Sequence, residues 1–181
     1  MKKRMIGLAL GNSNGCTVEE GFPILKQCGI EATFTSVGTH EELIRWADTA
    51  AKYGIFYSSL HAPFKNAAKM WDDNLDGEDA ERELISSIDA CVGINVPILV
   101  VHPFIGFYPH EPNEVGFGRF RRLAEYAEKK DVRVAFENVE GEAHLKMLMD
   151  GMRDLGSVGF CLDTGHELCY NRGRDMLAEY G

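Results

Sequence analysis

Four short polar motifs, each directly after an apolar run, contain the residues of this sequence that could do chemistry. The apolar runs span residues 55–60, 98–101, 132–136 and 158–162, and the polar residues that follow them are His61, His102, Glu137, Asp163 and His166. Imidazole and carboxylate groups are protein ligands of Zn²⁺ and related divalent ions. Their recurrence at the ends of successive predicted strands indicates a metal site, and hence a metal enzyme.

Each motif also has a purely structural interpretation. A histidine before proline, such as His61 or His102, can satisfy a buried carbonyl group. In the structural interpretation, Asp163 is simply a helix N-cap and His166 is a residue of the turn that follows. Glu137 is harder to explain in this way, because an ionised carboxylate is rarely placed at the end of a buried strand without a cation. Taken jointly, the motifs favour the metal site.

The apolar runs alternate with segments of helical pattern. Two of the predicted helices begin with capping boxes, Thr17-x-x-Glu20 and Thr39-x-x-Glu42. We expect strands at 5–10, 31–37, 55–60, 97–101, 132–136 and 158–162, and helices at about 17–28, 39–53, 79–93, 113–130, 141–155 and from 173 onward. Short apolar strands separated by helices are typical of a parallel sheet covered by helices. No linker or change in composition divides residues 1–181, which we therefore treat as a single domain.

Two parallel architectures fit this alternation. A doubly wound sheet places its site at one switch point between two strands, whereas a closed barrel brings all strand ends to one mouth. Polar residues end at least four successive strands, so we predict an α/β fold of the (β/α)8 TIM-barrel type. A complete barrel needs roughly 250 residues, and this sequence of 181 residues contains about six βα units. We therefore expect a truncated barrel that lacks its C-terminal units.

The composition disfavours some classes of partner and compartment, although a local basic groove remains compatible with it. A net charge of -9 and a pI near 5.1 disfavour a broad surface for nucleic acid or for an anionic membrane. The five cysteines contain no C-x-x-C pair, which predicts reduced, mostly buried thiols in a cytoplasmic protein. Lys2-Lys3-Arg4 precedes an apolar segment too short for a signal peptide, and no run reaches transmembrane length.

The motifs together resemble those of the xylose isomerase-like (AP endonuclease family 2) TIM-barrel superfamily. They are His61-Ala62-Pro63, Val101-His102-Pro103, Glu137-Asn138 and Cys161-Leu162-Asp163-Thr164-Gly165-His166. That superfamily includes sugar and sugar phosphate isomerases and epimerases, and also endonuclease IV. The resemblance implies that Glu137 and Asp163 are metal ligands, with Glu137 also the acid/base residue. His166 would contact substrate in the epimerase branch or bind metal in the endonuclease branch.

His61 and His102 match additional zinc histidines of the endonuclease branch, and His61 could also contact substrate. The leading hypothesis is a metal-dependent sugar (or sugar phosphate) isomerase/epimerase that acts through an enediolate and needs Mn²⁺, Zn²⁺, Co²⁺ or Mg²⁺. The alternatives are an endonuclease IV-like zinc phosphodiesterase at abasic DNA, and a non-catalytic truncated remnant. The remnant is considered because the superfamily completes its site with ligands on strands seven and eight. The charge of -9 favours a small carbohydrate substrate over nucleic acid, and the open barrel predicts a homo-oligomer.

Three further groups of residues receive structural interpretations. We expect His40, His110 and His144 to be surface residues. Arg119, Arg121 and Arg122 are interpreted as one solvated helix face. For the aromatic segment Phe104–Tyr108, loop packing is preferred over a role in walling a substrate pocket.

Overall fold

The computed structural model describes residues 4–11, 15–171 and 173–181. Lys2, Lys3 and residue positions 12–14 lie outside this described part of the chain. The described strands are β1 (Gly7–Ala9), β2 (Ala32–Ser36), β3 (Phe56–His61), β4 (Ile98–Val101), β5 (Arg133–Glu137) and β6 (Val158–Cys161). The helices are α1 (Val18–Gln27), α2 (His40–Tyr53), the 3-10 helix η1 (Ala67–Trp71), α3 (Leu75–Gly93), α4 (Glu114–Lys129), α5 (Glu142–Gly151), α6 (Thr164–Cys169) and α7 (Met176–Tyr180).

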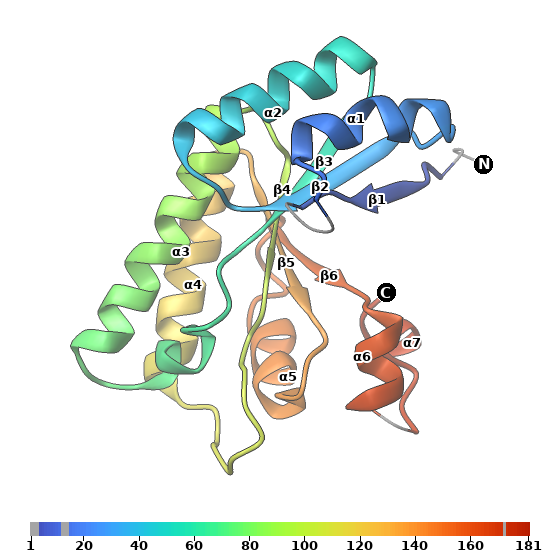
Figure 1. Ribbon diagram of the computed structural model, residues 1–181. Helices are drawn as coiled ribbons and strands as arrows, with labels where there is room; N and C mark the ends of the chain where they lie inside the picture. Colours follow the sequence, from blue (N-terminus) through green and yellow to red (C-terminus); the bar gives the residue numbers. More distant parts are fainter. Residues whose placement is uncertain (1–3, 12–14, 172) are drawn as a thin grey trace.

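The six strands form one sheet in sequence order, β1-β2-β3-β4-β5-β6, and every neighbouring pair is parallel. Figure 1 shows α2, α3 and α4 along one side of this sheet, with β1 and β6 at its two ends. All strands run in the same direction, so their carboxyl ends meet at one edge. The predicted α/β fold with six βα units of a TIM-barrel type is confirmed.

The starts of the helices follow local sequence signals. Thr17 and Thr39 each form the complete capping box with the glutamate three residues later. α3 begins at Leu75, earlier than expected, because the Asn74 side chain accepts a hydrogen bond from Gly77 N–H. This first turn lies outside the helix expected from the sequence. It contains Asp76 and Glu78, whose negative charges stabilise the positive end of the helix.

The hydrophobic core lies between the sheet and its covering helices. Phe22, Leu60, Phe120 and Phe136 have no exposed surface, and they come from α1, β3, α4 and β5. On β2 the exposed Phe34 alternates with buried threonines, so it lies on the face of the sheet away from those helices. In a closed barrel that face is the packed interior. In this open sheet it remains accessible.

Several expectations about individual residues are wrong. The first strand is found where expected, but it is shorter than residues 5–10: β1 covers three residues and, as an edge strand, has only β2 as a sheet neighbour. Arg119 is 4% exposed instead of solvated, since its guanidinium donates hydrogen bonds to the carbonyls of Met70 and Asp72. All five cysteines are free as predicted, but only Cys91 is buried. None of the described helices combines the length and apolar character needed to cross a membrane.

Candidate metal centre

Glu137 lies at the centre of a cluster at the carboxyl edge of the sheet. It is the last residue of β5, between the ends of β4 and β6, and its side chain is only 7% exposed. His61 ends β3 and His102 directly follows β4. The Nε2 atoms of both histidines lie 3.2 Å from Glu137 Oε2.

The second oxygen of Glu137 faces the β6–α6 connection. His166 Nδ1 lies 3.1 Å from Glu137 Oε1 and 4.0 Å from Asp163 Oδ2. Asp163 is the N-cap of α6, and its Oδ1 accepts a hydrogen bond from His166 N–H at 2.7 Å. Capping occupies one carboxylate oxygen of Asp163 and leaves the other for a ligand.

The structure therefore brings together all five residues that the sequence singles out. Two groups of ligand atoms result, each with all its atoms within 4.8 Å of one another: His61, His102 and Glu137, and Glu137, Asp163 and His166. Glu137 belongs to both groups. Either group could hold a divalent ion, and the mixture of imidazole and carboxylate donors suits the ions expected from the sequence.

The charges within the cluster are strongly coupled. Burial alone would raise the pKa of Glu137, but the hydrogen bonds and positive charge of His102 and His61 outweigh burial and hold the pKa at about 2. Burial lowers the pKa of His61, yet its contacts with Glu137 and with the Ala62 carbonyl more than compensate and raise it. The centre thus keeps an ionised carboxylate that attracts positive charge.

The hydrogen bonding fits a cation. His61 Nδ1 lies 2.8 Å from the Ala62 carbonyl, which fixes a proton on Nδ1 and directs the opposite nitrogen at Glu137. Nδ1 of His102 and Nδ1 of His166 are buried without a hydrogen-bond partner. A buried carboxylate surrounded by three imidazole rings needs protons on those rings or a metal ion to balance its charge.

A buried amide pair holds the two halves of the centre together. Asn138 has no exposed surface, and its side chain accepts from Asp163 N–H at 2.7 Å and donates to the Asp163 carbonyl at 2.9 Å. It also donates to Asn171 Oδ1 at 3.1 Å. Asn171 in turn donates to the Val139 carbonyl and to Glu142. The Glu137-Asn138 motif pointed to this region, but nothing in the local sequence indicated Asn171.

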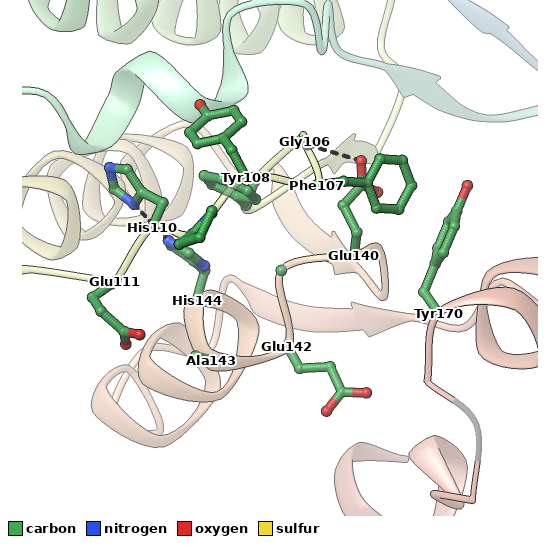
Figure 2. A pocket seen from close by; sticks show the side chains of 13 residues that line it. Gly106, Phe107, Tyr108, His110, Glu111, Glu140, Glu142, Ala143, His144 and Tyr170 are labelled. Atoms are coloured by element: carbon green, nitrogen blue, oxygen red, sulfur yellow. Dashed lines mark hydrogen bonds between the residues drawn. The ribbon is translucent and has the colours of Figure 1, made fainter.

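A cavity of about 570 Å³ lies beside this cluster of metal-ligand residues, between the β4–α4 and β5–α5 connections. Figure 2 shows Phe107, Tyr108 and Tyr170 around it, together with Glu140 and His144. The aromatic segment Phe104–Tyr108, for which the sequence favours loop packing over a role in walling a pocket, thus lines a cavity.

His144 is 2% exposed, which contradicts its expected place on the surface, because Phe104 stacks on its ring with centroids 4.2 Å apart. His110 is partly buried and its Nδ1 lies 3.1 Å from His144 Nε2, whereas His40 is exposed as predicted. Burial, followed by the charge of His110, lowers the pKa of His144 to about 4. His144 Nδ1 has no hydrogen-bond partner.

A parallel βα array with this centre at its carboxyl edge defines a class of protein. The chain belongs to the xylose isomerase-like TIM barrel family, whose model matches residues 24–181. The resemblance stated from the motifs is thereby confirmed.

The chain is similar to individual proteins to different extents. A curated protein of Mycoplasma capricolum subsp. capricolum, named "Probable endonuclease 4", is 30% identical over 129 residues, which is 65% of this chain and 43% of that protein. D-allulose 3-epimerase from Methylomonas sp. superposes with a TM-score of 0.74 at 14% identity, over 96% of this chain and 67% of its own. 3-keto-D-glucoside 4-epimerase from E. coli gives 0.74 at 15% identity, over 98% and 73%. The chain thus spans less than half of the curated relative, and the structural likenesses establish the fold alone.

Proposed function

We propose that the protein is a metal-dependent sugar or sugar phosphate isomerase/epimerase that acts through an enediolate. The observation that supports this most directly is the Glu137 carboxylate, which lies about 3.2 Å or less from the imidazole nitrogens of three histidines at the mouth of the βα array. Two structural neighbours are epimerases of sugars by name, D-allulose 3-epimerase and 3-keto-D-glucoside 4-epimerase. The proposed partner is therefore a small carbohydrate.

In this proposal Glu137, Asp163 and His102 hold the ion, with His61 and His166 as further ligands or substrate contacts. A divalent ion in this place supplies Lewis-acid polarisation of a carbonyl and its neighbouring hydroxyl. His166 is exposed enough, at 29% of its side chain, to hydrogen-bond a sugar oxygen.

Glu137 is also proposed as the acid/base residue that moves the proton between sugar carbons. Because its pKa lies at about 2, it is a weak base on its own. The ligand role is thus better supported than the base role.

The alternative function is an endonuclease IV-like phosphodiesterase at abasic DNA. Two observations favour it: the curated relative at 30% identity, and the sharing of Glu137 between two groups of ligand atoms, which suits a cluster of zinc ions. A non-catalytic remnant remains the third hypothesis, because the chain spans 67% of the epimerase structure and the resemblance implies further ligands on two more strands.

One experiment separates the three hypotheses. Purified protein loaded with Mn²⁺ or Zn²⁺ is incubated in D₂O with D-fructose, D-allulose and their 6-phosphates, while an abasic duplex is tested in parallel. Metal-dependent exchange of a sugar C–H for deuterium, lost in Glu137→Gln, supports the isomerase proposal. Exchange requires only that a proton is removed and replaced, so it is a more sensitive readout than net conversion. That sensitivity is useful because the chain is shorter than the epimerases.

The other outcomes are equally decisive. Cleavage of the duplex without sugar exchange would replace the leading proposal with the phosphodiesterase. Metal binding without either reaction would support the remnant. Glu41→Gln, on the exposed surface of α2, is the control variant and should leave each activity unchanged.

A further inference from the structure

The cavity beside the metal centre has a chemical character of its own. Among the residues that the structure describes, its charged lining consists of the carboxylates of Glu111, Glu140 and Glu142, beside two histidines, with no lysine or arginine. The charge of Glu142 is offset by its ion pair with Arg174, and Asn171 also donates a hydrogen bond to it. Glu140 accepts only a backbone N–H, from Gly106, and Glu111 is exposed with no ion pair among the described residues. The cavity therefore carries net negative charge.

The remaining lining is aromatic and open to a ligand. Phe107 is 80% exposed, and Tyr108 and Tyr170 are exposed as well. A large aromatic side chain left in solvent loses favourable burial that a ligand could restore. Aromatic faces contact the apolar C–H faces of sugar rings, while carboxylates accept hydrogen bonds from hydroxyl groups. At about 570 Å³ the cavity is within the usual range of small-molecule sites.

Tyr170, which lines the cavity, also contacts His166 of the metal centre. The ring of Tyr170 has its centroid 5.3 Å from that of His166 on one side and 5.6 Å from that of Phe107 on the other. Glu140 follows Glu137 by three residues, so their Cα atoms are at most about 11 Å apart. A ligand of two linked rings could reach both places. Figure 2 shows the rings of Tyr170 and Phe107 on the same side of the cavity.

We propose that this cavity is a second sugar subsite, which binds a neutral hydroxyl-bearing ring joined to the sugar at the metal centre and rejects a phosphate at that end. The proposal rests on the proposed function and narrows its substrate class from sugar or sugar phosphate to a glycoside-like neutral sugar. Phosphate is disfavoured because Glu111 and Glu140 would repel it and no basic residue in the described part of the lining would offset them.

The test compares three ligands by calorimetric titration in Mn²⁺ buffer: D-fructose, lactulose (fructose joined to a galactose ring) and D-fructose 6-phosphate. We expect lactulose to bind roughly three- to tenfold more tightly than fructose, the gain of one aromatic contact, and the phosphate ester to bind more weakly than fructose. Phe107→Ala should remove the advantage of lactulose and leave fructose binding unchanged. Glu111→Lys should strengthen binding of the phosphate ester.

The controls are matched surface changes away from the cavity. Leu75→Ala removes a side chain that is 73% exposed at the start of α3, and Glu41→Lys makes the same charge change on α2. Neither should alter the order of the three ligands. Equal affinity for lactulose and fructose, or an advantage that survives Phe107→Ala, would overturn the subsite.

Failure of the proposed function gives a different result. Lactulose binding that depends on Phe107 but not on Mn²⁺ would support the subsite and count against a sugar at the metal centre. Metal-dependent fructose binding with no advantage for lactulose would do the reverse. No binding of any of the three ligands would overturn both.

Discussion

Replacing Asn138 with alanine should both destabilise the protein and weaken its metal binding, because this side chain joins β5 to the β6–α6 connection. The substitution removes three hydrogen bonds, two to the Asp163 backbone and one to Asn171. At about 1 kcal/mol of net stability for each bond, the loss is about 3 kcal/mol. For a chain of this size that is roughly a 10 °C fall in melting temperature.

Metal affinity should fall as well, since Asp163 would no longer be held opposite Glu137. The assay is thermal unfolding with and without Mn²⁺, together with calorimetric titration of Mn²⁺ below the melting temperature. Ser157→Ala is the control, because Ser157 is also buried and donates one hydrogen bond, to the Ala124 carbonyl. It should cost about 1 kcal/mol and leave metal affinity unchanged. If Asn138→Ala melts within about 2 °C of the native protein, or binds Mn²⁺ as tightly, the positioning argument fails.

Three further predictions concern metal, pH and assembly. A divalent ion should raise the melting temperature, and Glu137→Ala combined with Asp163→Ala should abolish that rise; an unchanged rise would place the ligands elsewhere. The pKa of His144 is about 4 in the folded protein, below the ordinary 6.5, so the unfolded chain binds the proton first and stability should fall as pH drops from about 6.5 to 4. The loss is about 3 kcal/mol, and urea unfolding should show it diminished in His144→Gln; equal loss in that variant would refute the assignment. The open edges at β1 and β6 and the exposed Phe34 should drive self-association in sedimentation velocity, and a stable monomer at high concentration would contradict this.

Much of the fold follows from short-range signals in the sequence. The capping boxes at Thr17 and Thr39 fixed two helix starts, and the apolar runs located the strands. The convergence of the five candidate residues could be predicted because parallel strands of one sheet bring their carboxyl ends together. A strand end is recognisable locally even where its neighbours are unknown.

The residues that sequence reasoning misplaced depend on contacts distant in the chain. His144 is buried under Phe104. Arg119 is buried where it donates hydrogen bonds to carbonyl groups about 50 residues earlier in the chain. The role of Asn171 comes from its contact with Asn138, 33 residues earlier. Helical position alone predicts which face a residue occupies, but a loop that folds over that face cannot be read from periodicity.

The most direct test of the central claim is the location of a bound ion by anomalous diffraction from crystals grown with Mn²⁺ or Zn²⁺. The account predicts a peak within about 2.3 Å of the Glu137 carboxylate and of at least one of the histidines at positions 61, 102 and 166. A fully occupied peak that lies away from Glu137, or no peak in protein that has kept its fold, would contradict it.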